Sequence, residues 1–338
     1  MKVALFEKAH SLTIASKPLR EFRANEVLVK VQACGVCGTD VHIVEGSSRS
    51  TPPVILGHEF VGLVEDVGSD VHHIARGQQV AVDPNIACGM CYYCRKGLVH
   101  LCANLKALGV DLDGGMAEYC IAPMQQVYAL PERLDPNGSV FIEPVSCAIH
   151  GIDRANISVG DTVAILGGGT IGLLMLQLAK NAGAARTILV EPLEHKRRIA
   201  TELGADIVIN PKEIDTKSSI IDMTEVGADV VIECAGTAQT AQLSLELARR
   251  GGTVEFFGVC PVGEKILIEP NQVYFKELTI VGSYVNPNTF SRAITLLDSR
   301  KVRVDNFDTT TFPLEEVHQA LAFQREGKTI KSIIEPNK

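Results

Sequence analysis

Residues 161–191 read DTVAILGGGTIGLLMLQLAKNAGAARTILVE, and this stretch decides the fold. It contains a buried strand, a glycine loop, an apolar helix and a second strand. Further strands and helices alternate after it as far as about residue 285. This alternation predicts a doubly wound parallel sheet with both faces covered, which is an α/β fold of the Rossmann kind.

The loop GGGTIG at residues 167–172 matches the pattern G-x-G-x-x-G at Gly167, Gly169 and Gly172, with Thr170 and Ile171 between the last two glycines. It follows a strand and opens a helix, which is the context of a dinucleotide-binding loop. A pyrophosphate would lie on the helix N-terminus, where free amides and the helix dipole favour anions. The plainer alternative, a bare strand–turn–helix junction, explains fewer of these features.

Glu191 ends the strand that follows this helix, at the position where an acidic residue accepts hydrogen bonds from the adenosine ribose. A carboxylate there repels a 2′-phosphate, so NAD is favoured over NADP. The basic segment HKRR at residues 195–198 provides the alternative, because basic side chains after that strand can hold a phosphate.

The regions on either side of the alternating strands and helices have different sequence patterns. Residues 1–145 are short apolar runs cut by Gly, Pro and Asp, which predicts a β-rich domain. Residues 146–285 form the expected dinucleotide-binding domain. Residues 286–338 contain two amphipathic helical patterns and a closing strand, IKSIIEP, which predicts a return to the first domain.

Composition narrows the class of protein. The 338 residues carry a net charge of −8, which argues against nucleic-acid and anionic-membrane surfaces as partners. The apolar runs are too short for a membrane span or a signal peptide, so a cytoplasmic location is expected. Cysteines in that compartment stay reduced, which weakens a disulfide interpretation of the ten cysteines.

Four cysteines are concentrated in CGMCYYCRKGLVHLC, at Cys88, Cys91, Cys94 and Cys102. Four thiolates satisfy tetrahedral zinc and leave no open position, as in a structural site. Iron–sulfur ligation also uses closely spaced cysteines, so spacing by itself leaves that alternative open. A redox pair would leave two of the four cysteines unexplained.

A second group of possible ligands is spread along the chain. It contains Cys37 in GVCGTDVH, His58 and Glu59 in GHE, and Glu143 in IEPVSCAIHG. Mixed Cys, His and Glu ligands suit a catalytic zinc that keeps one position for water or substrate. Each residue taken singly is equally compatible with a core or surface role, so the prediction depends on the whole set.

Seven segments together resemble the zinc-dependent medium-chain alcohol dehydrogenase family across essentially the whole chain: CGVCGTDVH, GHEFVGLVEDVG, CGMCYYCRKGLVHLC, DGGMAEY, EPVSCAIHG, GGGTIG and GKTIKSII. The resemblance implies a GroES-like catalytic domain in the β-rich part and two zinc ions per subunit. One ion would be structural on the four cysteines, and one would be catalytic on Cys37 and His58. Glu143, where many alcohol dehydrogenases have cysteine, resembles the polyol (sorbitol-like) branch. In that branch Glu59 can bind the metal while the later acid acts through water, so the division between the two acids stays open.

The same resemblance implies further roles. Asp40 would orient the imidazole of His58. Thr39 would accept the substrate proton, which His42 would carry towards solvent after passage through the nicotinamide ribose. Lys331 would contact the cofactor diphosphate, with a surface lysine at a strand end as the alternative.

The resulting expectation is a zinc enzyme that transfers a hydride from a secondary hydroxyl of a polyol or related alcohol to NAD, as a homotetramer or homodimer. A threonine-dehydrogenase-like activity and a cyclitol or aminocyclitol substrate are the enzymatic alternatives. A structural zinc protein that retains a Rossmann domain is the non-enzymatic one. Sorbitol-type enzymes carry an arginine where Val285 stands, so Tyr284, Asn286 and Asn288 are candidates for other polar contacts, with a turn as the alternative role for the two asparagines.

Overall fold

The computed structural model describes residues 1–338 and divides the chain into two compact units. The sequence places residues 300–306 in the return to the first domain, whereas the structure includes them in the second unit. Gln177 explains this difference, because its side chain donates to the carbonyl of Arg303 at 3.0 Å and accepts from its amide at 2.8 Å. Unit 1 contains Met1–Ser146, Asn286–Ser299 and Phe307–Lys338, and unit 2 contains Cys147–Val285 and Arg300–Asn306.

Unit 2 is built on a six-stranded sheet in which all neighbouring strands are parallel. The strand order is β13-β12-β11-β14-β15-β16. The chain therefore starts in the middle of the sheet, fills one side and then returns to fill the other, as in a dinucleotide-binding fold. This order confirms the doubly wound sheet predicted from residues 161–191. The strands are β11 (Thr162–Leu166), β12 (Arg186–Val190), β13 (Ile207–Ile209), β14 (Ala228–Glu233), β15 (Ala248–Phe256) and β16 (Thr279–Gly282).

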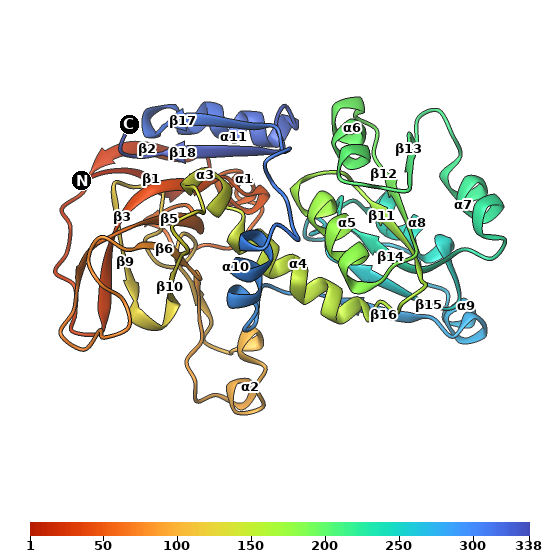
Figure 1. The fold of residues 1–338 in the computed structure, drawn as a ribbon, viewed down its shortest axis with the longest axis horizontal. Coiled ribbons are helices and arrows are strands. Elements are labelled where there is room, and N and C mark those ends of the chain that lie inside the picture. The colour runs from red at the N-terminus through yellow and green to blue at the C-terminus, as the bar shows by residue number, and fades with distance from the viewer. The chain divides into compact units, whose positions relative to one another are not determined.

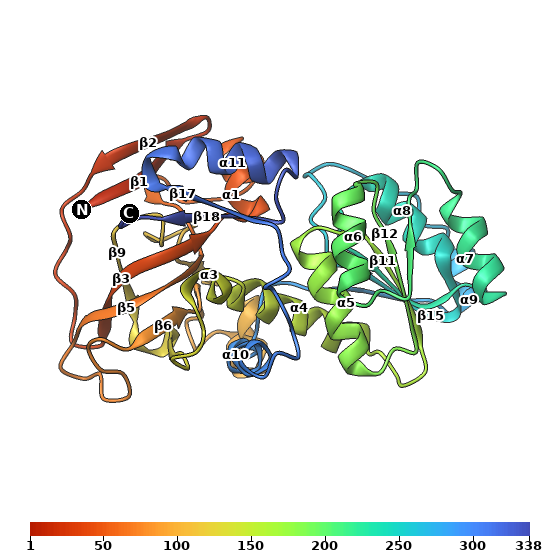
Figure 2. The same cartoon turned by 45° about the horizontal axis from the view of Figure 1, so that its top comes forward.

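Helices cover both faces of this sheet. As Figures 1 and 2 show, α5 (Thr170–Ala182) and α6 (Glu194–Glu202) lie on one face, and α7 (Thr216–Thr224) and α8 (Ala238–Leu247) lie on the other. The sequence analysis does not predict α7 or α9 (Pro270–Lys276). In α7 only Thr216 and Ile220 are buried, and α9 buries no residue. Neither helix therefore has the apolar stripe by which a helix is recognised in a sequence.

One acidic side chain in unit 2 is enclosed without a hydrogen-bond partner. Glu255 of β15 is 0% exposed, and neither carboxyl oxygen has a partner. A Cβ atom added to Gly151 would lie 2.9 Å from Glu255 Oε1, so the backbone packs directly against the carboxyl group. Burial raises the pKa of Glu255 to about 8, although the nearby charge of Arg154 lowers it. The carboxyl group is therefore protonated at neutral pH.

Unit 1 holds the β-rich part of the chain. Its largest sheet has seven strands, with the order β10-β6-β5-β3-β18-β17 and with β9 paired to β3. Strand β18 pairs antiparallel with β3, which joins the C-terminal residues to this sheet. The strands of unit 1 are β1 (Lys2–Lys8), β2 (Ser11–Ser16), β3 (Glu26–Gly35), β4 (Val54–Ile55), β5 (Glu59–Val67), β6 (Gln79–Val82), β7 (Asn85–Ile86), β8 (Lys106–Ala107), β9 (Tyr119–Pro123), β10 (Val127–Ala129), β17 (Thr309–Pro313) and β18 (Lys331–Glu335).

Short helices complete unit 1, and α4 (Ile142–Ala155) begins in unit 1 and ends in unit 2. No helix of the structure combines the length and the apolar character that crossing a membrane requires. The helices of unit 1 are α1 (Gly38–Val44), α2 (Tyr92–Arg95), α3 (Pro136–Ser139), α10 (Phe290–Asp298) and α11 (Val317–Glu326), with 3₁₀ turns η1 (Val99–Leu101), η2 (Met124–Gln126) and η3 (Leu314–Glu316).

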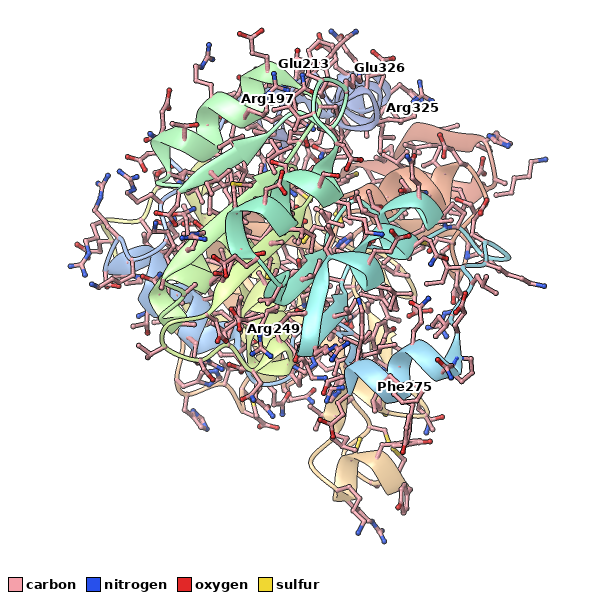
Figure 3. The ribbon with its side chains drawn as sticks, turned by 90° about the vertical axis from the view of Figure 1, so that its right-hand side faces the viewer. Arg197, Glu213, Arg249, Phe275, Arg325 and Glu326 are labelled. Carbon is pink, nitrogen blue, oxygen red and sulfur yellow. The ribbon has the colours of Figure 1, made fainter.

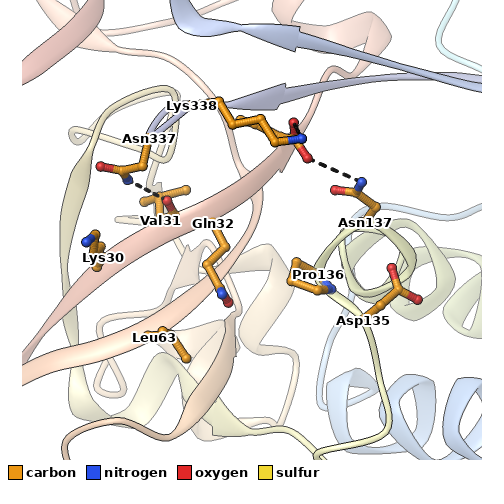
Figure 4. A pocket seen from close by; sticks show the side chains of 10 residues that line it. Lys30, Val31, Gln32, Leu63, Asp135, Pro136, Asn137, Asn337 and Lys338 are labelled. Carbon is orange, nitrogen blue, oxygen red and sulfur yellow. Dashed lines mark hydrogen bonds and ion pairs between the residues drawn. The ribbon is translucent and has the colours of Figure 1, made fainter.

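A hollow of about 480 Å³ in unit 1 is lined by residues of β3, α3 and the C-terminal segment (Figure 4). Its lining includes the polar residues Lys30, Gln32 and Asp135. Asn337 borders it and donates from Nδ2 to the carbonyl of Val31 at 2.7 Å. The lining contains no cysteine or histidine, so the predicted metal ligands lie elsewhere.

Candidate metal centres and cofactor site

The turn from β3 into α1 places Cys37 beside Asp40. Cys37 is the N-cap residue of α1, and its backbone N–H donates to Asp40 Oδ2 at 2.8 Å. This bond holds the Asp40 side chain inward, where it is completely buried. Cys34 is completely buried in β3 and is not among the residues whose possible ligand atoms group with that of Cys37.

Strand β5 brings His58 and Glu59 to Cys37. Strands β3 and β5 pair antiparallel, with Gly35 opposite Glu59, so the start of β5 meets the end of β3. One ligand atom from each of Cys37, His58 and Glu59 lies within 4.8 Å of the others. His58 and Glu59 are both buried. A thiol, an imidazole and a carboxylate form the mixed donor set of a zinc site with an open position.

Asp40 is also the partner of His58. Its Oδ1 lies 3.4 Å from His58 Nδ1. Burial lowers the pKa of His58, but the charges of Asp40 and Cys37 raise it, and the net shift is upward. A carboxylate beside Nδ1 favours the tautomer whose Nε2 lone pair can bind a metal. The geometry therefore agrees with the orienting role expected of Asp40.

Lys331 belongs to this buried group and is not a surface lysine. It is 2% exposed, and its Nζ donates to Glu59 Oε2 at 2.6 Å and to the carbonyl of Val36 at 3.3 Å. Burial lowers its pKa, but Glu59, Cys37 and Glu143 raise it, and the net shift is upward. The ammonium group is therefore a cation held against Glu59. Its contact with a cofactor diphosphate stays a prediction.

Glu143 lies in the first turn of α4 and is buried. It is not among the three residues whose ligand atoms group within 4.8 Å, so Glu59 is the carboxylate that the fold places with Cys37 and His58. Glu143 still acts on the same surroundings, because its charge contributes to raising the pKa of Lys331.

Thr39 and His42 lie three residues apart on α1, a spacing that puts two side chains on one side of a helix. The thiol of Cys37 donates to Thr39 Oγ1 at 3.6 Å. His42 Nδ1 lies 3.4 Å from the hydroxyl oxygen of Ser47, a residue that is exposed. Thr39 is therefore next to the candidate ligands, and His42 is next to the surface. The proton route between them stays a prediction.

The four predicted cysteines converge in the loop that contains α2 and η1. One Sγ atom from each of Cys88, Cys91, Cys94 and Cys102 lies within 4.8 Å of the others. The Sγ atom of Cys91 lies 3.5 Å from that of Cys94 and 3.9 Å from that of Cys102. Backbone amides of Met90 and Cys91 lower the pKa of Cys88 to about 6, which favours its thiolate. Four thiols in such a group fit tetrahedral zinc with no open position.

The tip of this loop is exposed and aromatic. Met90 and Tyr92 are each 70% exposed. The rings of Tyr92 and Tyr93 meet edge to face, with centroids 5.5 Å apart, and the ammonium of Lys96 lies 6.0 Å from the centre of the Tyr92 ring. Two tyrosines therefore lie beside the four thiols.

The glycine loop in unit 2 has the backbone that its pattern predicts. Gly167 has a φ of 104°, and a Cβ atom on Gly172 would lie 1.8 Å from the carbonyl oxygen of Gly167. Neither position accepts a side chain without strain. Gly169 is the N-cap residue of α5 and faces open space, and Thr170 and Ile171 begin the helix. These features let a pyrophosphate approach the N-terminus of a helix.

Glu191 has a structural task that the sequence analysis does not predict. Its Oε2 accepts from the amide of Gly168 at 2.7 Å, and its Oε1 accepts from the amide of Leu193 at 2.8 Å. The carboxylate therefore holds the glycine loop against the turn after β12. Each oxygen keeps a second lone pair, so ribose hydroxyls can also be accepted. Arg197 Nη1 donates to the carbonyls of Glu191 at 3.0 Å and Pro192 at 2.7 Å.

The structure does not agree with the substrate contact considered for Asn286, in the segment after Val285. Asn286 is 2% exposed, and its amide group donates to Ser146 and Asp83 and accepts from Asn85, so it does not offer a polar contact to a substrate. Asn288 has a φ of 56°, which fits the turn alternative. Tyr284 remains, with 53% of its surface exposed.

Comparison with known families covers most of the chain. Residues 23–132 match the alcohol dehydrogenase GroES-like domain, and residues 170–299 match the zinc-binding dehydrogenase family. The first match lies within unit 1 and agrees with the GroES-like domain that the motifs imply.

Similar proteins agree over the full length. D-arabinitol dehydrogenase 1 from Uromyces fabae is 33% identical over 341 residues, which cover 100% of this chain and 97% of the relative. L-threonine 3-dehydrogenase from Pyrococcus horikoshii is 37% identical over 316 residues, which cover 91% of this chain and 90% of the relative. A zinc-binding dehydrogenase from Sinorhizobium meliloti 1021, solved with NADP bound, is 42% identical, covers 99% of both chains and has a TM-score of 0.96. The family predicted from the motifs is confirmed, and the chain belongs to the zinc-dependent medium-chain alcohol dehydrogenases, in their polyol branch.

Proposed function

We propose that the protein oxidises a secondary hydroxyl group of a polyol or related alcohol and passes the hydride to NAD. The observation that carries this proposal is the buried group of Cys37, His58 and Glu59, whose ligand atoms lie within 4.8 Å of one another. The donor set leaves room for a substrate oxygen at a four-coordinate metal. The relatives that oxidise arabinitol, sorbitol and threonine support the reaction type.

Two zinc ions per subunit fit the donor sets of the chain. Cys88, Cys91, Cys94 and Cys102 would hold one. Cys37 and His58 would hold the other, with Glu59 or a water beside Glu143 as the further ligand. When bound, the second ion would lower the pKa of an alcohol hydroxyl, and the oxidised nicotinamide would accept a hydride.

Residues of the chain would transfer the proton of the substrate hydroxyl group to the surface. Thr39 lies beside Cys37 and carries a hydroxyl group that both accepts and donates hydrogen bonds. It would take the proton from the substrate, and His42 would release it near Ser47 at the surface. Lys331 would hold Glu59 in place, so that this carboxylate keeps a fixed orientation beside His58.

We propose NAD as the preferred cofactor because Glu191 places a carboxylate after β12, where a 2′-phosphate would bring a second negative charge. The similar structure with NADP and the guanidinium of Arg197, labelled in Figure 3, define the alternative. Glu191→Ala is expected to weaken NAD use and to reduce discrimination against NADP, measured as the ratio of kcat/KM values. Arg197→Ala is the matched control. If wild type already prefers NADP and Arg197→Ala removes that preference, the role given to Glu191 is wrong.

The substrate class is best tested with one panel. Reduction of NAD and of NADP would be followed with sorbitol, arabinitol, several cyclitols, an aminocyclitol, L-threonine and ethanol. We expect a polyol or cyclitol to be the best substrate, because buried carboxylates near the ligands suit a substrate with several hydroxyl groups. L-threonine as the best substrate would favour the alternative that the 37% identical relative represents. Ethanol far above every polyol and cyclitol would overturn the proposal. No activity and no bound zinc would favour the non-enzymatic alternative.

We also propose that the protein forms a homo-oligomer, a dimer or a tetramer. Strand β16 pairs on only one side, with β15, so its other edge has unpaired backbone groups. Helix α9 next to it carries Tyr274 and Phe275, which are 76% and 69% exposed, and Phe275 is labelled in Figure 3. Exposed aromatic side chains of this kind mark interaction surfaces. Sedimentation of wild type and of a Phe275→Ser variant would test the proposal, and a monomeric wild type would contradict it.

A cytoplasmic location is proposed from the same chemistry. All ten cysteines are free of disulfides in the structure, and five of them, Cys37, Cys88, Cys91, Cys94 and Cys102, are candidate metal ligands. Thiols that must bind metal need a reducing compartment. Cell fractionation would test this, and recovery of the protein outside the cytoplasm would contradict it.

A further inference from the structure

The side chain of Asn286 is fully used inside unit 1. Its Nδ2 donates to Ser146 Oγ at 2.8 Å and to Asp83 Oδ1 at 3.4 Å. Its Oδ1 accepts from Asn85 Nδ2 at 2.7 Å. Asn286, Ser146 and Asp83 are all buried. Buried polar groups are costly unless they are paired, so such a network fixes the segments that it joins.

The network ends at the first turn of α4. Ser146 Oγ donates to the carbonyl oxygen of Glu143 at 2.6 Å. Thr289 Oγ1 donates to the carbonyl oxygen of Ser146 at 2.7 Å, and Thr289 is also buried. Residues 286–289 therefore form hydrogen bonds with both the hydroxyl group and the carbonyl group of Ser146. The turn that carries Glu143 is held in place by side chains from outside the helix.

The backbone at and next to residues 286–289 contains two residues with positive φ. Val285 has a φ of 47° and Asn288 has a φ of 56°, both in the left-handed region. Valine is rarely found there, so this conformation of Val285 persists only where the surrounding contacts hold it. The hydrogen bonds of Asn286 and Thr289 are the contacts that flank it.

We propose that Asn286 is a positioning residue, which fixes the first turn of α4 through Ser146 so that the buried Glu143 keeps a fixed orientation. The inference rests on the proposed function, because it assumes that Glu143 serves the proposed catalytic metal.

The opposite end of the network reaches the loop after β6. Asp83 accepts the backbone amide of Asn85 at 3.0 Å as well as the amide of Asn286. Burial raises the pKa of Asp83 to about 6, although these two donors lower it. Asn286 therefore joins the helix of Glu143 to the segment that leads into the four-cysteine loop.

The test compares Asn286→Ala with Asn337→Ala. Asn337 is the matched control, because its Nδ2 also makes two hydrogen bonds in unit 1, to the carbonyls of Val31 and Glu118, but none to α4. Both variants are expected to melt a few degrees below wild type. Only Asn286→Ala is expected to lose kcat, by roughly 10-fold, as for other residues that orient metal-site groups. The KM for the nicotinamide cofactor should not change in either variant.

A second readout does not depend on turnover. Release of zinc to a colorimetric chelator should become faster for one of the two ions in Asn286→Ala and stay at the wild-type rate in Asn337→Ala. Ser146→Ala should reproduce the effect, and the double variant Asn286→Ala/Ser146→Ala should lose no more than the larger single loss, because both remove one link.

If Asn286→Ala does not fold, Ser146→Ala and Thr289→Val carry the same comparison, because each removes a smaller part of the network. Equal kcat and equal zinc release in Asn286→Ala and Asn337→Ala, or additive losses in the double variant, would overturn the inference. A wild type that binds two zinc ions but oxidises nothing in the panel would contradict the proposed function, while zinc release would still decide the role of Asn286.

Discussion

The four-cysteine loop and the Cys37 site use similar donor atoms but are assembled in opposite ways. All four thiols of the loop come from residues 88–102, and Cys91 and Cys94 are only partly buried. The ligands of the Cys37 site come from the end of β3 and the start of β5, and the lysine beside them comes from β18. We therefore expect the loop to depend on the proposed zinc for its shape, whereas the second site receives its shape from the sheet. Loss of a ligand should affect folding in one and chemistry in the other.

The largest effect is expected for Cys37→Ser. The sheet that positions His58 and Glu59 does not need this thiol, so the melting temperature should stay within a few degrees of wild type. The loss of kcat/KM should exceed the roughly 10–100-fold that follows loss of an orienting partner, because a ligand itself is removed. Cys260→Ser, which changes a partly buried thiol in unit 2, should match wild type in both measurements. A Cys37→Ser enzyme with nearly full activity would show that the group is not the active site.

Cys91→Ser should have the reverse profile. A closed zinc site contributes directly to folding, so its loss should lower the melting temperature and reduce the metal content by about one ion per subunit. The activity of the molecules that remain folded should fall much less than in Cys37→Ser. Metal analysis and calorimetry on the same preparations decide the matter. Unchanged zinc content together with an unchanged melting temperature would refute a structural zinc in this loop.

Lys331→Met tests the Cys37 site, whose shape comes from the sheet, by removing the buried ammonium group beside it. Glu59 would be left buried without its cation, which costs about 3–5 kcal/mol in comparable buried pairs. Urea unfolding should show this loss. The double variant Lys331→Met/Glu59→Gln should recover much of it, because neither charge then remains. If the double variant is less stable than Lys331→Met, the pair is not the source of the loss.

Glu255→Gln gives the contrasting case of a buried acid that is not hydrogen-bonded to a cation. The pKa of Glu255 is raised from 4.5 to about 8 by burial, so the folded state keeps a proton that the unfolded state releases. Below about pH 4.5 the group is protonated in both states and does not destabilise the fold. As the pH rises from there towards 8, the free energy of unfolding falls, because only the unfolded state releases the proton. Glu255→Gln should unfold at higher temperature than wild type at pH 8, with a gain of at most a few kcal/mol. The two proteins should differ less at pH 5. A variant that is less stable at both pH values would contradict the proposed state of this carboxyl group.

Local patterns predicted much of the molecule, because the features concerned are local in the chain. The glycine loop and the strands around it lie in one stretch, and the four cysteines lie in another. The sheet of unit 2 and the family are both confirmed. The role of Lys331 was harder to predict, because its partner Glu59 is 272 residues away and is reached only through the pairing of β18 with β3 and of β3 with β5. The same holds for Asn286, whose partners lie in α4 and after β6.

Two of the sequence-based alternatives fail for one physical cause. The surface position considered for Lys331 and the substrate contact considered for Asn286 both require an accessible side chain, yet each residue is 2% exposed because other segments supply its partners. Periodicity finds an amphipathic element, but it does not detect a buried polar residue whose hydrogen bonds are made by distant parts of the chain. The bonds of Glu191 to Gly168 and Leu193 were missed for a related reason, since they depend on backbone amides that no pattern of side chains reveals.

The aromatic tip of the four-cysteine loop has a spectroscopic consequence. The chain contains no tryptophan and six tyrosines, so its intrinsic ultraviolet emission comes from tyrosine, and Tyr92 and Tyr93 lie directly beside the four thiols. A paramagnetic ion such as cobalt in that loop should quench part of this emission. The same ion at Cys37 would lie in a different part of the fold, among residues that include neither tyrosine. Fluorescence can thus report the filling of one metal centre, and reduced nicotinamide can be followed in the same cuvette without interference from indole emission.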